Sequence, residues 1–265
     1  MSIDINKAIN TTFKDPKWVQ KLLIGGLFYF VIQFINSLIG IFNYISQNHF
    51  DFSRFPLFSI FSAIFFQLSI LISLILLSAI PIGYVLQSVH NQIIAENEFL
   101  PEWRDNIYSY FINGLKYILI KFIYSFILFF LVSIPLILGI SIFKIFIDNQ
   151  IISYAGIILT SLVAVFVILG YVLILPLIFI SFAENYVIQD SFNIKRMFGI
   201  FIKNINDFIL CDLLVLAAFI IQILLSLLLV CTCIGILFIP FLYLPFFLIV
   251  MNLFTQAYLN AKSSV

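Results

Sequence analysis

The sequence predicts an all-α membrane protein: a bundle of six transmembrane helices arranged as three hairpins, each preceded by a cytoplasmic interfacial amphipathic helix. Three observations lead to this prediction. Hydrophobic residues make up 63% of the chain and charged residues only 9%, against about 25% charged residues in soluble domains. Several uncharged runs exceed the roughly 20 residues that a helix needs to cross a bilayer. These runs lack the strict apolar–polar alternation that strands of a transmembrane barrel require.

Each uncharged run predicts one span, except the last. The run between Asp212 and Lys262 is too long for a single crossing, so we expect it to turn near Thr232–Gly235. The whole chain, 1–265, is then a single integral membrane domain. The six predicted spans lie near residues 22–45, 57–89, 117–147, 151–182, 209–231 and 236–259.

The positive charges predict the orientation. Of the 13 lysines and arginines, all except Arg54 and Lys144 fall on one side of this topology. Because cytoplasmic loops carry an excess of Lys and Arg, both termini are expected in the cytoplasm, with the protein in the cell membrane. The first apolar run is longer than the core of a signal peptide and follows four lysines, so we expect the first span to be retained.

An amphipathic segment is predicted on the cytoplasmic side before each odd-numbered span. In the first, Ile5, Ile9 and Phe13 are apolar at helical spacing; in the third, Ile194 and Phe198 repeat this pattern among basic residues. Together with the hairpins, they predict three similar units along the chain. The three predicted interfacial helices lie near residues 3–16, 104–116 and 191–206.

A short sequence echo supports this threefold pattern. Gly-Tyr-Val-Leu at 83–86 recurs at 170–173, and an Ala-Glu-Asn triplet follows each copy, at 95–97 and 183–185. A shared repeat origin and chance reuse of a small apolar alphabet are both left open. The candidate residues taken from this echo are Gly83, Tyr84, Gly170, Tyr171 and Glu184.

Four segments resemble a known family. FKDPKWVQKLLIGG at 13–26, IGYVL at 82–86, LPEW at 100–103 and NGLKY at 113–117 resemble a prokaryotic membrane family called domain of unknown function 4013. The likeness is closest over the first half of the chain. It implies a membrane fold but no functional residue, because that family has no assigned activity. More loosely, the layout is similar to the six-helix membrane domain of glycerophosphodiester phosphodiesterases, whose catalytic barrel this chain lacks.

Few polar residues are candidates for a site. Lys121 and Asp212 lie in the first turns of the third and fifth predicted spans, where they either form an ion pair or reach separately to the interface. The acidic loop 96–105 contains Glu102, Trp103 and Arg104. Its carboxylates suit acid–base work or a metal, but the LPEW segment equally fits a helix cap.

These patterns leave three functions open. The first is a non-catalytic membrane protein that binds lipids or protein partners through basic interfacial helices. The second is a transporter of a small apolar or amphipathic molecule, and the third is an intramembrane enzyme. No catalytic residue, cofactor or metal site is predicted, because no motif of that kind occurs. Membrane lipids are the expected partners, protein partners or a homo-oligomer are left open, and a net charge of +1 argues against nucleic acid.

Overall fold

The structure is a computed structural model that describes residues 3–49, 56–95, 100–104, 106–145, 150–232 and 234–263. Every regular element within these residues is a helix, as predicted. In chain order they are α1 (Ile5–Phe13), α2 (Trp18–His49), α3 (Pro56–His90), η2 (Asn91–Ala95), α4 (Ile107–Ile145), α5 (Gln150–Asn185), η3 (Ile188–Phe192), α6 (Ile194–Lys203), α7 (Ile205–Cys231), η4 (Ile234–Phe238) and α8 (Ile239–Ser263).

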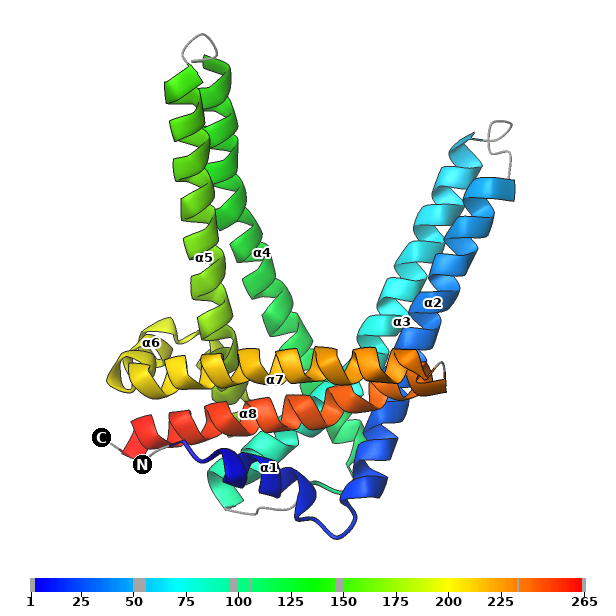
Figure 1. Ribbon diagram of the computed structural model, residues 1–265, viewed down its shortest axis with the longest axis vertical. Coiled ribbons are helices and arrows are strands. Elements are labelled where there is room, and N and C mark those ends of the chain that lie inside the picture. Colours follow the sequence, from blue (N-terminus) through cyan, green and yellow to red (C-terminus); the bar gives the residue numbers. More distant parts are fainter. Residues whose placement is uncertain are drawn as a thin grey trace.

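The predicted hairpins are confirmed. Helix α2 packs against α3, α4 against α5, and α7 against α8, and Figure 1 shows these three pairs. Among the described residues, six stretches of helix are long and apolar enough to cross a membrane, one in each member of these pairs. The turn expected between the last two spans lies between the end of α7 at Cys231 and the start of η4 at Ile234.

Two of the three predicted interfacial helices exist as separate helices, namely α1 and α6. The prediction of a separate helix at 104–116 is wrong, because α4 runs without a break from Ile107 to Ile145. The reason is the packing of its first turns. Tyr110 and Gly114 are buried against α3, so the apolar face of this segment continues the span instead of lying along the interface.

Two of the hairpins meet at one end and separate at the other (Figure 1). The α2–α3 and α4–α5 pairs diverge from a common base, while α7 and α8 run across them near that base. Contacts of α3 with α4 and of α2 with α8 join the hairpins. Helices α1 and α6 and both ends of the described chain also lie in this region. We call this common base the junction.

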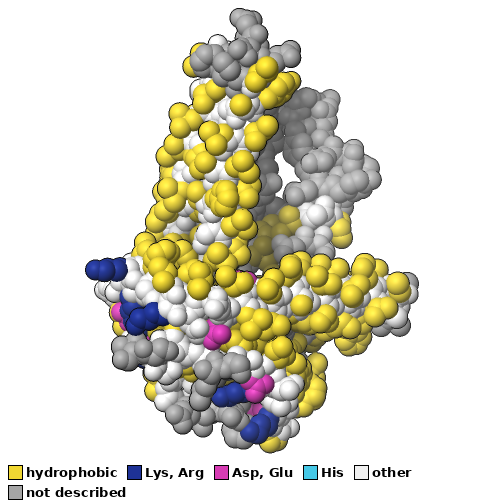
Figure 2. All heavy atoms as spheres, turned by 60° about the vertical axis from the view of Figure 1, so that its left-hand side comes forward, with side chains coloured by type: hydrophobic (Ala, Val, Ile, Leu, Met, Phe, Trp, Pro, Cys, Tyr) yellow, Lys and Arg dark blue, Asp and Glu magenta, His cyan; other side chains and the backbone are white. Residues whose placement is uncertain are grey.

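Most of the fully buried large side chains lie in the junction, among them Tyr84, Tyr110, Phe182 and Tyr258. In contrast, Phe129 and Phe166, further along the α4–α5 hairpin, are 64% and 72% exposed. Figure 2 shows apolar side chains covering this hairpin and α7–α8, with charged side chains gathered at the junction. Apolar exteriors this large are typical of helices that face lipid.

Two glycines allow α3 and α4 to cross with their backbones in contact. A methyl group at Gly83 would overlap the backbone carbonyl of Tyr110, and one at Gly114 would overlap that of Ala79. Small residues at helix crossings in membranes permit this close approach. Gly170 differs, because no atom lies within 4 Å of a methyl group placed there. The two glycines of the sequence echo therefore have different structural roles.

Candidate functional site

Lys21 is buried in the junction, where it contacts one buried and one exposed carboxylate. Its side chain, 5% exposed, places Nζ 2.7 Å from Oδ2 of Asp15 and 2.9 Å from Oε1 of Glu102. The same nitrogen donates a hydrogen bond of 2.7 Å to the backbone carbonyl of Leu100. An ammonium group has three N–H donors, so these contacts satisfy it fully. We call these four residues the Lys21 cluster.

Asp15 also fixes the start of α2. Its Oδ1 accepts a hydrogen bond of 2.7 Å from the backbone N–H of Lys17. Burial alone would raise the pKa of Asp15, but hydrogen bonds from Lys21 and Lys17 and the charge of Lys21 outweigh burial and lower that pKa. Asp15 is therefore ionised at neutral pH, and its charge compensates that of Lys21.

Trp103 of the LPEW segment stacks on Tyr84 beside this cluster, with ring centroids 4.0 Å apart and planes 5° apart. Its indole N–H donates a hydrogen bond of 2.8 Å to the backbone carbonyl of Lys21. The Tyr84 hydroxyl donates one of 3.1 Å to the carbonyl of Pro101. The structure thus joins three candidates, Glu102, Trp103 and Tyr84, in one packed unit.

In the acidic loop, the described carboxylate is that of Glu102, which is half exposed and paired with Lys21. Glu102 binds Lys21, and its backbone carbonyl accepts a hydrogen bond of 2.7 Å from the Tyr110 hydroxyl. Arg104 is exposed. The other carboxylates of the loop, at 96, 98 and 105, lie outside the described residues. Within the described part of the chain, no group of three His, Cys, Asp or Glu side chains could hold a metal ion.

Glu184, which is itself buried, is the centre of a second cluster. Its Oε2 accepts hydrogen bonds of 2.5 Å from Arg196 and 2.7 Å from the hydroxyl of Tyr258, and its Oε1 accepts one of 2.7 Å from Lys262. The guanidinium also donates a hydrogen bond of 3.0 Å to the same hydroxyl. These residues, which we call the Glu184 cluster, join α5, α6 and α8.

The chain turns sharply next to this cluster. Tyr186 has a φ of 56°, the left-handed conformation that often follows the last residue of a helix. Its hydroxyl donates a hydrogen bond of 2.9 Å to Gln87 on α3. His90, also on α3, lies 2.8 Å from the backbone carbonyl of Ala183. This turn directs the chain from α5 into η3 and α6, which brings Arg196 to Glu184.

Lys121 and Asp212 form no ion pair with each other. Lys121 is exposed on α4. On α7, Oδ2 of Asp212 is buried and has no hydrogen-bond partner among the described residues. The pairing hypothesis is therefore wrong, and the alternative, that each side chain reaches separately to the interface, stays a prediction.

The second copy of the sequence echo is also unlike the first. Tyr171 lies 3.2 Å, hydroxyl to hydroxyl, from Ser125, whereas Tyr84 is fully buried beside Trp103. Glu184 is in the second cluster, but its counterpart at 96 lies outside the described residues. The equivalent glycines and tyrosines of the two copies therefore occupy different environments.

Sequence reasoning missed most residues of both clusters. The sequence pattern presents Asp15, Lys21, Arg196 and Lys262 as flanking charges, and Tyr258 as part of an apolar span. One signal was available: Lys21 falls at the start of a span with Asp15 six residues before it, and a lysine at that depth needs a partner. No comparable local signal links Glu184 to residues 74 and 78 positions further on, because only the fold brings those segments together.

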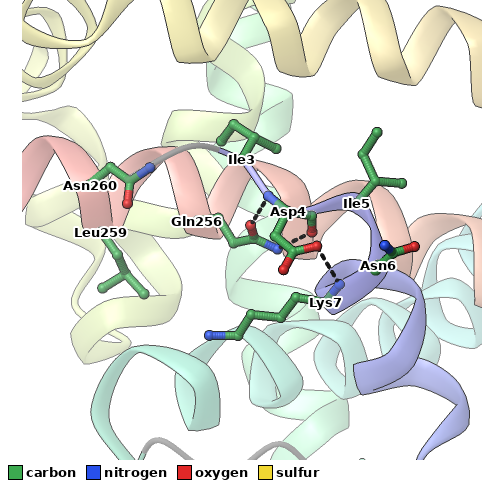
Figure 3. A pocket seen from close by; sticks show the side chains of 8 residues that line it. All are labelled: Ile3, Asp4, Ile5, Asn6, Lys7, Gln256, Leu259 and Asn260. Atoms are coloured by element: carbon green, nitrogen blue, oxygen red, sulfur yellow. Dashed lines mark hydrogen bonds between the residues drawn. The ribbon is translucent and has the colours of Figure 1, made fainter.

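A recess lies between residues 3–7 and helix α8. It has a volume of about 760 Å³ and is lined by residues 3–7 and by Gln256, Leu259 and Asn260. Figure 3 shows that Asp4 and Gln256 bond to each other through two hydrogen bonds, of 2.9 and 3.1 Å. Asp4 also accepts a hydrogen bond of 3.0 Å from the backbone N–H of Lys7 and so caps α1. These bonds attach the N-terminal helix to α8.

Six apolar helices with exposed exteriors, and charges gathered at one end, define a multi-pass membrane protein. Over residues 65–231 the chain matches the model of a family described as Protein of unknown function (DUF4013). Because this region is more than half of the chain, the protein belongs to that family. It contains three of the four resembling segments, and the one at 13–26 precedes it. No curated protein and no solved structure matches the chain. These comparisons do not show the looser likeness to the membrane domain of glycerophosphodiester phosphodiesterases.

Proposed function

We propose that this protein is a non-catalytic membrane protein that binds anionic lipids at the junction, with α1 and α6 lying in the membrane interface. In this proposal the junction faces the cytoplasm, both termini lie on that side, and the membrane is the cell membrane. Protein partners or a second copy remain compatible with this role.

One observation carries the proposal: α6 is amphipathic even after it has packed. Met197 is buried against the protein, while Ile194, Phe198 and Ile202 are between 53% and 57% exposed. These three side chains are four residues apart and form an apolar stripe on the outer side of the helix. A helix with an exposed apolar stripe and basic residues beside it binds the surface of an anionic membrane.

Helix α1 supports the same interpretation. Its Ile5, Ile9 and Phe13 are 37–45% exposed and share one face, while Ala8 is buried. Lys7 and Lys14 belong to the same segment. The two interfacial helices thus present apolar and basic residues together, and both lie at the junction.

Transport is the second candidate, because four spans contain a proline. Pro81, Pro135, Pro176 and Pro245 lie inside α3, α4, α5 and α8. A proline has no backbone N–H, so it frees a carbonyl of the preceding turn, and some transporters use such carbonyls. Pro240 differs from these four, since it is the second residue of α8. Lipid binding is favoured because both ion clusters lie at the junction, away from the far ends of the hairpins.

The test is lipid selectivity of the purified protein, by native mass spectrometry from nanodiscs with equal phosphatidylglycerol and phosphatidylcholine. We expect phosphatidylglycerol to be retained preferentially. Each Lys near an anionic surface contributes about 1 kcal/mol, so Lys195→Gln with Lys203→Gln should lower this preference by about fivefold per lysine. Lys144→Gln, at the other end of α4, is the matched control and should leave it unchanged. Equal retention of both lipids by the unaltered protein would refute the proposal.

A further inference from the structure

An apolar groove runs between the N-terminal segment and the last hairpin. Its volume is about 500 Å³, within the range of about 300–1,000 Å³ typical of ligand sites. One wall comes from α1 and the first turns of α2, including Phe13, Trp18 and Leu23. The other comes from α7 and α8, including Phe241 and Pro245. All of its lining residues are apolar or aromatic.

The groove exists because α2 and α8 cross closely. A methyl group at Gly25 would overlap the Leu244 side chain, and one at Gly26 would overlap the Phe241 ring. These glycines bring the two helices together and place Phe241 and Pro245, one turn apart, along the groove. Helix α1 then lies beside the crossing without filling it, since Phe13 keeps 37% of its surface exposed.

Two aromatic rings line the groove, and a lysine adjoins each of them in the sequence. Phe13 and Trp18 meet edge to face, with ring centroids 5.0 Å apart and planes at 88°. Lys14 follows the first ring in the chain and Lys17 precedes the second, and both lysines are exposed. Lys17 also lies 4.0 Å from Glu102, a distance at which an exposed pair contributes little. Aromatic rings and lysines of this kind mark the headgroup level of a membrane.

From this arrangement we infer that the groove binds one acyl chain of an anionic glycerophospholipid, with the phosphate at Lys14 and Lys17. The inference deepens the proposed function and rests on it, because it names one lipid site among those that the junction attracts. An acyl chain fits this lining, since the indole N–H of Trp18 is the one hydrogen-bonding group among the side chains that line the groove. The neighbouring lysines select an anionic headgroup over a zwitterionic one.

The protein carries its own reporter for this site. It has two tryptophans, of which Trp18 lines the groove and Trp103 is 4% exposed. In vesicles that contain lipids with brominated acyl chains, bromine in the groove quenches Trp18 fluorescence. Trp18→Phe supplies the background signal from Trp103. For each brominated lipid, the measured quantity is the mole fraction that gives half-maximal quenching of Trp18. We expect this mole fraction to be at least about fivefold lower for phosphatidylglycerol than for phosphatidylcholine.

Two pairs of variants distinguish the contribution of the lipid headgroup to binding from that of the acyl chain. Lys14→Gln with Lys17→Gln should abolish the difference between the two lipids, while Lys195→Gln with Lys203→Gln on α6 should leave it in place. Leu23→Phe narrows the groove and should weaken quenching by both lipids. Leu27→Phe, one turn further along α2 and 52% exposed, should not.

The groove site is overturned if both lipids quench Trp18 equally in the unaltered protein, or if Leu23→Phe behaves like Leu27→Phe. In either case Trp18 contacts only bulk lipid. Failure of the proposed function would be seen in a different experiment. That experiment is native mass spectrometry, which measures whether phosphatidylglycerol is retained and whether this retention depends on Lys195 and Lys203.

Discussion

Replacement of Lys21 by Met is expected to lower the free energy of unfolding by about 3–5 kcal/mol, because removing one partner of a buried ion pair leaves the other charge uncompensated. Lys21 is the only cation of the Lys21 cluster, and Asp15 is 3% exposed. Without the ammonium group, the Asp15 carboxylate is left buried with no compensating charge, and the carbonyl of Leu100 loses its donor. Unfolding in mixed micelles, followed by circular dichroism during titration with SDS, measures this change.

Lys17→Met is the matched control. Lys17 lies four residues from Lys21, its side chain is 65% exposed, and its ammonium group is 4.0 Å from the Glu102 carboxylate. Exposed pairs of this kind contribute about 0–1 kcal/mol, so its removal should change stability little. If Lys17→Met and Lys21→Met have the same effect, the Lys21 cluster does not hold the junction together.

Gly83→Ala is expected to destabilise the protein by about 1–3 kcal/mol, the usual cost of adding a methyl group to a packed interior. The added methyl group would meet the backbone of α4 at Tyr110, which cannot move without separating the two helices. A shift of α4 would also disturb the hydrogen bond from Tyr110 to the LPEW segment. The same SDS titration measures the loss.

Gly170→Ala provides an unusually close control, because both glycines precede Tyr-Val-Leu inside long apolar helices. A methyl group at Gly170 meets no atom within 4 Å. Alanine is the better helix former by about 1 kcal/mol, so this variant should be neutral or slightly stabilised. Equal destabilisation by both substitutions would show that α3 and α4 do not cross at Gly83.

The helices were predictable because local composition alone determines them. In a membrane each span satisfies its own backbone hydrogen bonds, so a long uncharged run is enough to identify it. The hairpins followed from short connections between spans. The failure at 104–116 has a physical cause: an amphipathic segment can face either the interface or another helix, and the burial of Tyr110 and Gly114 against α3 decided the outcome.

The candidate site was predicted less well, because its residues come from distant parts of the chain. Asp15 and Lys21 meet the LPEW segment about 80 residues later, and Glu184 meets Tyr258 and Lys262 further on. Local patterns identified Glu102, Trp103, Tyr84 and Glu184 as unusual, but no spacing rule indicates their partners. Lys121 and Asp212 were paired by their similar depth in the sequence, and depth does not determine which faces of two helices meet.

The central claim of the proposed function is that all three hairpins begin and end at the cytoplasmic face of the membrane. Single cysteines in a variant without Cys211, Cys231 and Cys233, labelled with a membrane-impermeant maleimide in sealed vesicles of known orientation, test it most directly. The first set of variants is Lys7→Cys, Tyr108→Cys and Lys195→Cys, and we expect these cysteines to react from the cytoplasmic side. The second set is Ile151→Cys and Leu237→Cys, and we expect these to react from the opposite side. If the first set reacts from different sides, or if both sets react from the same side, the three-hairpin topology is contradicted.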